Sequence, residues 1–397
     1  MPARDSGYLW FTAGVASWFA AWGMQMVLFS WLIVGELGAG PEWVGVAQTS
    51  TMLPSLALLL LGGVAADRFD PRRMLIALHV VAVIPVLALG LAVDQAWLSL
   101  PVLIAYGLVM GTISAFVMPA RDSLLSSVAG PDIMRAVTGM TAAQFGAQAL
   151  GNLFAGSARW LGSIPALGLQ ALLLLVGSLA TMQVHRALTE RAPVVRASPW
   201  RDIVEGLGIV SRTPQLRSPL ILVVAVGFLF VGPFLVVFPL LVRDYYQGGV
   251  DDLSLVLMTF PIGTIAGSLV LRARGGVQAK GRAALLALAC GAGALAMVGT
   301  GPPFAVMLAA TIAWGLAGSV FINCSRTLYQ EAAPPTQRAR VLSIYQLGFM
   351  GAAPLGALTA GVVSASLGSL QTLELFAAGM LILVALVWGL TDTARLR

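Results

Sequence analysis

Long apolar runs separated by short polar segments dominate the chain. One uncharged run extends from Trp43 to Ala66, and another extends from Met74 to Val93. Because a membrane span needs roughly 20 consecutive apolar residues, this pattern predicts an all-α integral membrane protein. The runs predict twelve transmembrane helices, at about residues 9–35, 42–66, 74–93, 97–120, 134–160, 163–184, 218–242, 253–271, 283–300, 302–325, 341–366 and 369–390.

The longest polar segment, residues 185–217, divides these spans six and six. We therefore expect an N-terminal six-helix bundle at 1–186, a cytoplasmic linker at 187–217 and a C-terminal six-helix bundle at 218–397. Within the linker, Ser198 followed by Pro199 is a helix start, and apolar residues after it recur on one face. This predicts an amphipathic helix on the inner leaflet.

The two halves are related in sequence, and internal repeats are typical of transporter folds. The shared positions, at an offset of 205, are Phe116 and Phe321, Arg121 and Arg326, Arg135 and Arg340, Gly146 and Gly351, Gly151 and Gly356, and Gly156 and Gly361. The repeat predicts two bundles related by a pseudo-two-fold axis.

Composition and charge exclude other classes. The chain is 58% hydrophobic and 10% charged, whereas soluble domains carry about a quarter charged residues. Its net charge of +6 comes from arginines scattered between apolar runs, so nucleic-acid binding is not expected. Of the 23 basic residues, 21 lie on the side of the loop at 67–73, which places that loop and both termini in the cytoplasm.

No enzyme chemistry is predicted. Two cysteines and two histidines cannot build a metal site of usual composition. A Gly-rich phosphate loop ending in Lys-Ser or Lys-Thr is also absent, so ATP-driven transport has no support. We expect no cofactor and no metal.

A charged stretch between the second and third runs carries the strongest signal. It resembles the signature Gly-x-x-x-Asp-Arg-x-Gly-Arg-Arg of the major facilitator superfamily, on Gly63, Asp67, Arg68, Arg72 and Arg73. Asp70-Pro71 replaces a single Gly, a variant similar to the branch with enterobactin exporters and macrolide efflux pumps. The equivalent loop of the second half, residues 272–282, has no carboxylate.

The resemblance implies a cytoplasmic gate at this stretch. A carboxylate such as Asp67 is stabilised by the positive N-terminal end of a helix, here the predicted helix that begins near Arg340. We expect Arg72 or Arg73 to reach Asp122. Arg121 and Arg326, at the cytoplasmic mouth, either anchor the topology or meet an anionic group. The predicted gating residues are Gly63, Asp67, Arg68, Arg72, Arg73, Arg121, Asp122, Arg326 and Arg340.

The resemblance also implies that helices 1, 4, 7 and 10 line a central cavity. On helix 1, four residues fall on one face at helical spacing, and a packed or lipid-facing aromatic stripe is the alternative. The predicted substrate-binding residues are Trp18, Trp22, Gln25, Phe29, Tyr106, Met110, Phe230, Phe234 and Trp314. Since the middles of these helices carry no Lys, Arg, Asp or Glu, a small dianion is not the expected substrate.

These observations predict a secondary transporter of the bacterial inner membrane. We expect a monomer that exports an amphipathic small molecule, of the drug or siderophore type, by alternating access in exchange for protons. The middle of helix 4 lacks the arginine common in proton-coupled relatives. An importer or facilitator of a siderophore, lysolipid or other metabolite is the alternative. A membrane enzyme would need a polar catalytic cluster, and a scaffold protein would not need the cavity face.

Overall fold

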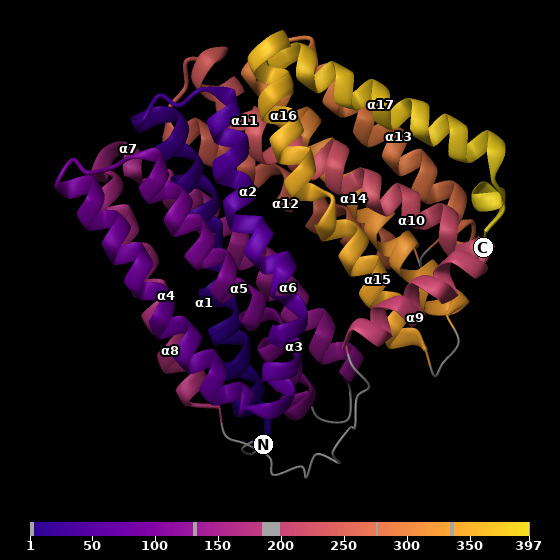
Figure 1. The fold of residues 1–397 in the computed structure, drawn as a ribbon, viewed down its shortest axis with the longest axis horizontal. Coiled ribbons are helices and arrows are strands. Elements are labelled where there is room, and N and C mark those ends of the chain that lie inside the picture. The colour runs from indigo at the N-terminus through magenta and orange to yellow at the C-terminus, as the bar shows by residue number, and fades with distance from the viewer. Residues whose placement is uncertain (1–3, 130–132, 185–198, 275–276, 334–336, 397) are drawn as a thin grey trace. The chain divides into compact units, whose positions relative to one another are not determined.

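The computed structural model describes residues 4–129, 133–184, 199–274, 277–333 and 337–396 (Figure 1). All regular secondary structure in these ranges is helical, which confirms the all-α prediction. The chain separates into two compact units, each described by itself. Unit 1 comprises Met1–Ala39, Val46–Val194 and Gln247–Met258, and unit 2 comprises Gly40–Gly45, Val195–Tyr246 and Thr259–Arg397.

Unit 1 is built around its first helix. α1 packs against α5, α6 and α8, and α4 packs against α5 and α8. The helices are α1 (Arg4–Trp31) with a π-helical turn (Leu32–Glu36), most of α2 (Pro41–Ala57), α3 (Leu59–Arg68), α4 (Pro71–Asp94), α5 (Leu100–Val128), α6 (Ile133–Ala155), α7 (Ala158–Leu161) and α8 (Ser163–Met182).

Unit 2 repeats this kind of packing. α13 packs against α14 and α17, and α11 packs against α16. The helices are α9 (Pro199–Arg212), α10 (Pro214–Val226), a π-helical turn (Gly227–Val231), α11 (Gly232–Asp244), most of α12 (Val250–Ala273), α13 (Lys280–Gly299), α14 (Phe304–Ala332), α15 (Arg338–Gly351), α16 (Ala353–Leu367), α17 (Ser369–Leu390) and a 3-10 turn (Asp392–Arg395).

Ten helices in the described residues are long and apolar enough to cross a membrane, and the count rises to 11 if the bent pair α2 and α3 is taken as one span. The twelfth predicted span, 134–160, corresponds to α6, which ends earlier, at Ala155. α6 is a full 23 residues long but is less apolar, because polar residues such as Gln148 and Asn152 lie on its buried face.

Two predicted spans are interrupted. The span predicted at 42–66 breaks at Leu58, between α2 and α3. The span predicted at 341–366 breaks at Ala352, between α15 and α16. The second break has a clear cause, since Pro354 lacks the N–H that would bond to the carbonyl of Met350.

Unit 2 contains the helix predicted for the linker. α9 packs on α15 through Gly206, where an added Cβ would lie 2.8 Å from Cγ1 of Ile344. Val204 and Leu207 on α9 are exposed. The first part of the predicted linker, 187–198, lies outside the described residues.

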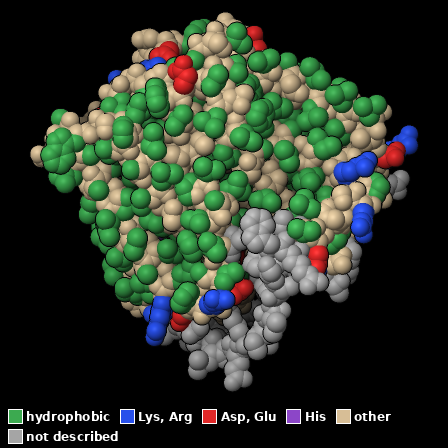
Figure 2. Space-filling view, in the orientation of Figure 1, with side chains coloured by type: hydrophobic (Ala, Val, Ile, Leu, Met, Phe, Trp, Pro, Cys, Tyr) green, Lys and Arg blue, Asp and Glu red, His purple; other side chains and the backbone are tan. Residues whose placement is uncertain are grey.

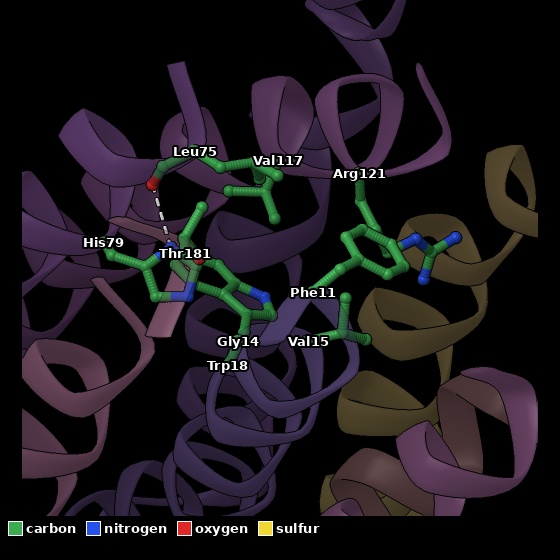
Figure 3. Close-up of a pocket in the computed structure, with 9 residues that line it drawn as sticks. All are labelled: Phe11, Gly14, Val15, Trp18, Leu75, His79, Val117, Arg121 and Thr181. Carbon is green, nitrogen blue, oxygen red and sulfur yellow. Dashed lines mark hydrogen bonds between the residues drawn. The ribbon is translucent and has the colours of Figure 1, made fainter. Parts of the chain in front are cut away.

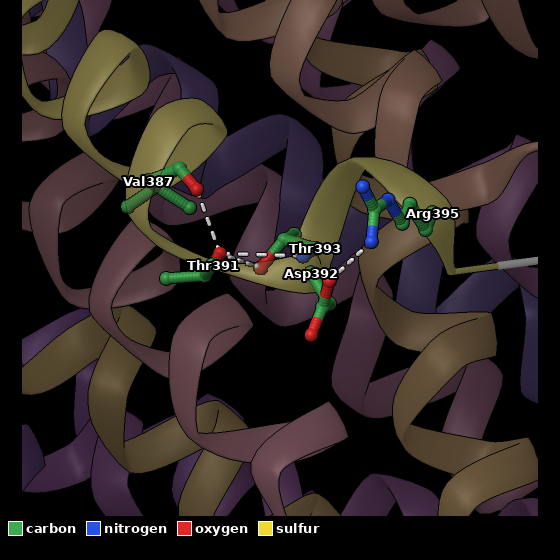
Figure 4. Close-up of polar contacts among 5 residues, drawn as sticks. All are labelled: Val387, Thr391, Asp392, Thr393 and Arg395. Carbon is green, nitrogen blue, oxygen red and sulfur yellow. Dashed lines mark hydrogen bonds and ion pairs between the residues drawn. The ribbon is translucent and has the colours of Figure 1, made fainter.

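Hydrophobic side chains cover most of the described surface on the face shown in Figure 2, and charged side chains are sparse there. Such a surface suits a lipid environment. At the end of the last helix, Thr391 bonds to the carbonyl of Val387 at 2.7 Å and to Thr393, while Arg395 pairs with Asp392 at 3.1 Å (Figure 4). These contacts end α17 and start the terminal turn.

Candidate transport path and cytoplasmic gate

The signature loop starts α4 by a helix cap. The carboxylate of Asp70 accepts a hydrogen bond from the backbone N–H of Arg72 at 3.0 Å, and Pro71 occupies the first helical position. Asp at the N-cap and Pro at the first position are both favoured at helix starts. The Asp70-Pro71 departure from the family signature therefore has a structural role.

The arginines of this loop do not all lie where the sequence suggested. Arg72 donates from Nε to the carbonyl of Thr181 at 3.3 Å and from Nη2 to the carbonyl of Met182. It thus binds the C-terminal end of α8, where a cation is favoured by the helix dipole. Arg72 makes these bonds, and Asp122 pairs with Arg121. Of the two residues predicted to reach Asp122, the contact from Arg73 stays a prediction.

The glycines of the loop differ in role. A Cβ at Gly62 would collide with the carbonyl of Ala115 on α5, whereas a Cβ at Gly63 would meet nothing within 4 Å. Close backbone approach therefore depends on Gly62 in this structure. Asp67, Arg68 and Arg73 are exposed, and their gating roles stay predictions.

Arg121 of the predicted gate contacts side chains on two other helices. Its guanidinium pairs with Asp122 at 2.7 Å, donates to Gln144 Oε1 at 2.8 Å and lies 5.6 Å from the ring centre of Phe19. The Arg121 side chain is only 13% exposed. It therefore links α5, α6 and α1 on one side of unit 1.

In unit 2 the repeat-related arginine is placed differently. Arg326 is exposed on α14. Near it along the helix, Tyr329 donates to the carbonyl of Leu216 at 2.7 Å, and its ring lies 5.1 Å from that of Tyr345. Arg340 forms a 2.7 Å ion pair with Glu205 of α9.

The predicted cavity residues of unit 1 divide into separate groups. Phe29 stacks on Tyr106 at 5.8 Å, and Gln170 of α8 lies 3.4 Å from the Tyr106 hydroxyl. Trp22 packs edge-on against Phe19. The substrate-binding roles of Trp22, Phe29 and Tyr106 stay predictions. The residues of α1 contact different neighbours and do not meet at one point.

The remaining residues predicted on this path are buried. Gln25 is 7% exposed, and its Oε1 has no hydrogen-bond partner in the described structure. Met110 is 3% exposed. A buried amide oxygen without a partner is costly, and the binding role of Gln25 stays a prediction.

In unit 2 the three predicted residues converge. Phe230 and Phe234 lie 5.2 and 5.7 Å from the ring of Trp314, both edge-on. Phe238 and Phe260 complete this aromatic cluster, at 6.0 and 5.3 Å from Trp314. The sequence analysis missed both, although Phe238 follows Phe234 by one helical turn. Phe260 comes from α12, and helical spacing carries no signal for it.

A narrow cavity lies among α1, α4, α5 and α8 of unit 1 (Figure 3). The side chains that line it come from Phe11, Gly14, Val15, Trp18, Leu75, His79, Val117, Arg121 and Thr181. Trp18 therefore faces His79, with ring centres 5.1 Å apart, instead of the other predicted cavity residues. The sequence analysis assigned His79 no role.

Two further polar contacts lie outside the spans. Arg159 forms a 2.9 Å ion pair with Asp251, and this hydrogen bond raises the pKa of the guanidinium. Tyr246 donates to the carbonyl of Pro302 at 2.6 Å, and partial burial, aided by Tyr245, raises its pKa to about 12. Both contacts fix loops that join helices.

Solved structures of transporters share this fold. The nucleoside transporter NupG aligns over 96% of this chain and 98% of its own, with a TM-score of 0.77 and 13% identity. The D-xylose–proton symporter aligns over 99% of both chains, with a TM-score of 0.75 and 14% identity. The chain thus has the fold that these transporters share.

Sequence comparison gives the family. Residues 6–393 match the family described as transmembrane secretion effector. The multidrug efflux pump Tap of Mycolicibacterium fortuitum is 27% identical over 380 residues, covering 91% of this chain and 90% of that pump. Tap of Mycobacterium tuberculosis strain H37Rv is 26% identical over 368 residues, covering 87% and 84%. The chain belongs to the transmembrane secretion effector family of the major facilitator superfamily. It is therefore a multi-pass membrane transporter and not an enzyme.

Proposed function

We propose that this transporter exports amphipathic small molecules of the drug type from the cytoplasm across a bacterial inner membrane, by alternating access and in exchange for protons. The observation that carries the proposal is the uncharged, aromatic middle of its predicted substrate helices. Residues 6–35, 100–120, 218–242 and 304–325 contain no Lys, Arg, Asp or Glu. The likeness to multidrug efflux pumps over nearly the whole chain supports the same proposal.

The aromatic cluster of unit 2 suits such a substrate. Trp314 is 3% exposed and Phe230 is 5% exposed. A ligand that binds between these two rings would therefore make a large apolar contact area. Aromatic rings grip apolar and diffusely charged molecules by area and stacking. A small dianion would lack a compensating charge here and would lose its hydration.

Thermal stabilisation of the purified protein tests the substrate class. The panel consists of amphipathic antibiotics, siderophores and lysolipids, with sugar phosphates and dicarboxylates as the charged small molecules. We expect the amphipathic antibiotics to raise the melting temperature and the small dianions to leave it unchanged. Preferential stabilisation by siderophores would redirect the proposal to siderophore transport.

Two substitutions locate the binding site. Trp314→Ala should weaken binding of an active compound by about tenfold, equivalent to ~1.4 kcal/mol. Trp388→Ala is the matched control, because Trp388 is 39% exposed on α17, away from the cluster. Gln25→Ala should selectively weaken the binding of compounds that carry a hydrogen-bonding group. Strong binding of a dianion that neither Trp314→Ala nor Gln25→Ala affects would contradict the proposal.

The predicted orientation is tested on a single helix. Phe69 and Trp97 flank α4, both are 66% exposed, and a helix of 24 residues spans about 36 Å at 1.5 Å per residue. After replacement of Cys290 and Cys324 by Ser, Phe69→Cys should be labelled by an impermeant reagent only from the cytoplasm. Trp97→Cys should be labelled only from outside. Labelling of both from one side would refute the orientation.

A further inference from the structure

The cavity among α1, α4, α5 and α8 contains the one histidine that the structure describes (Figure 3). His79 lies on α4, two turns after the helix starts at Pro71, and is 2% exposed. Its Nδ1 lies 2.8 Å from the carbonyl of Leu75, so Nδ1 carries the hydrogen and donates it. The free lone pair is then on Nε2.

Nε2 has no hydrogen-bond partner in the described structure. A buried polar atom is normally paired. Packing against neighbouring helices does not by itself explain why Nε2 of His79 is left without a partner. Gly177 of α8 makes room for this edge of the ring, since a Cβ there would lie 2.7 Å from Nε2. Trp18 packs edge-on with the imidazole, with ring centres 5.1 Å apart.

The groups that face the ring decide how an added proton on Nε2 is accommodated. The Gly14 backbone on α1 is close enough to the imidazole to accept a hydrogen bond from a ring N–H. α8 contributes Thr181 and no charged group, and α1 contributes only uncharged residues. The charged groups are both cations: Arg121 of α5 at the far end of the cavity, and Arg72 of α4, bound to the end of α8.

We propose that His79 binds the coupling proton, and that protonation of Nε2 acts on the cytoplasmic gate through the cavity that it shares with Arg121. In this step Nε2 uses its lone pair to bind a proton from water, and the neutral imidazole becomes an imidazolium with N–H groups toward Leu75 and Gly14. The new positive charge repels the Arg121 guanidinium, and loss of the proton restores the attraction of Arg121 to its present partners. This inference rests on the proposed proton-coupled export.

Imidazole is suited to this task because its pKa in water, about 6.5, allows both forms near neutral pH. The carboxylates described in the spans lie toward the helix ends, as with Asp122, Glu331 and the exposed Glu374. His79 is therefore buried within a span and has a titratable atom without a partner in the described structure. It also lines the same cavity as Arg121, a predicted gating residue.

Proteoliposome transport separates coupling from binding. With a gradient of about one pH unit, the wild-type protein should accumulate substrate up to about tenfold for each proton exchanged. His79→Asn keeps a donor for the Leu75 carbonyl, and His79→Gln places an amide near the position of Nε2. Neither titrates near neutral pH. Both variants should lose the gradient-driven accumulation but retain substrate exchange without a gradient within about threefold of the wild type.

Matched controls identify the outcomes. His185→Asn removes the other histidine of the chain and should leave coupling intact. Coupled transport by both His79 variants at the wild-type level would overturn the assignment of His79. Absence of any pH-gradient effect in the wild type would instead overturn the proton coupling proposed for the transporter as a whole.

A second measurement needs no variant. Hydrogen–deuterium exchange at the imidazole Cε1 position, followed by mass spectrometry of the folded wild-type protein, reports whether each histidine titrates. Over a scan from about pH 4 to 9, we expect the exchange rate at His79 to change with pH, and this dependence to shift when substrate is added. A His79 exchange rate that stays constant with pH over this range would overturn the proposal, even if the variants fail to fold.

Discussion

Arg121 and Arg326 occupy equivalent positions of the sequence repeat, and the two units treat them differently. In unit 1 the Arg121 side chain is 13% exposed and contacts Asp122, Gln144 and Phe19. In unit 2 Arg326 is exposed. An equivalent residue on an equivalent helix therefore does not imply an equivalent contact.

The repeat itself explains the difference. At the offset of 205 that relates the arginines, Asp122 corresponds to Thr327, and Gln144 corresponds to Phe349. Unit 2 therefore has the arginine but lacks the carboxylate and the amide that contact Arg121 in unit 1. Near Arg326, unit 2 has hydrogen bonds made by hydroxyl groups. The hydroxyls of Tyr345 and Ser325 lie 3.0 Å apart, and the Tyr329 hydroxyl donates to the carbonyl of Leu216. Among the described residues, the contacts that the Arg121 guanidinium makes with Asp122, Gln144 and Phe19 therefore have no counterpart at Arg326.

The largest expected effect is the loss of transport when Arg121, and not Arg326, is replaced by alanine. Arg121→Ala removes a charge-assisted hydrogen bond to Gln144, a contact worth about 1.5 to 3 kcal/mol, and should reduce transport by about tenfold or more. Arg326→Ala removes an exposed group and should change transport by less than about twofold. Drug efflux by cells with matched expression measures both.

A control checks that the contacts, and not the charge alone, matter in unit 1. Arg121→Lys keeps the charge but cannot satisfy Asp122 and Gln144 with a planar guanidinium. Its transport should lie closer to that of Arg121→Ala than to the wild type. Equal loss of transport in Arg121→Ala and Arg326→Ala would show that the gate is symmetric.

Much of the fold followed from the sequence because membrane spans are set by apolar length. The sequence placed most helix ends to within five residues and also predicted the helix α9, whereas α5 and α14 extend eight and seven residues beyond their predicted ends. It did not place the π-helical turns at Leu32–Glu36 and Gly227–Val231, since these depend on local backbone geometry. The interruption at Ala352 did have a sequence signal, Pro354.

The gate and the cavity were less predictable, because they depend on contacts between helices. Phe230, Phe234 and Trp314 lie in one aromatic cluster, and their role in substrate binding stays a prediction. Trp18 shares its helical face with Phe29 in sequence, yet it packs against His79. Arg72 or Arg73 was expected at Asp122, and Arg72 binds the end of α8. Helical spacing tells which residues share a face but not which neighbouring helix covers each part of it.

The next effect concerns how the helix after each gate loop begins. α4 has a side-chain cap from Asp70, whereas α13, which follows the equivalent loop of unit 2, begins after Ala279 without one. Asp70→Ala should destabilise the protein by about 0.5 to 2 kcal/mol. Ala279→Asp should stabilise it by a smaller amount.

Thermal melting in detergent measures both variants. Asp70→Asn is the matched control, since Asn also caps helices well, and it should retain most of the wild-type stability. A fall in stability as large for Asp70→Asn as for Asp70→Ala would mean that the carboxylate charge, and not the cap, is the important property.

A smaller effect is expected in the hydroxyl contacts of unit 2. Tyr329 is fully buried, and Tyr329→Phe removes its bond to the Leu216 carbonyl while keeping the ring against Tyr345. The loss should be about 1 kcal/mol of stability. Tyr8→Phe is the unit 1 counterpart, because its hydroxyl bonds to the carbonyl of Ala136 at 2.7 Å. If Tyr329→Phe melts at the wild-type temperature, the hydroxyl does not contribute to closing this part of unit 2.

The smallest effect is expected from restoring one of the lost partners of Arg326. Thr327→Asp recreates in unit 2 the Arg-Asp pair that Arg121 and Asp122 form at 2.7 Å. Because Arg326 is exposed, the new pair should contribute only about 0.2 to 1 kcal/mol, and added salt should reduce it further. Comparison of the melting temperature with that of Thr327→Asn, at low and high salt, isolates the charge. A much larger stabilisation would mean that unit 2 can support the same guanidinium contact as unit 1, so that the asymmetry would arise from the missing carboxylate alone and not from the exposure of the site.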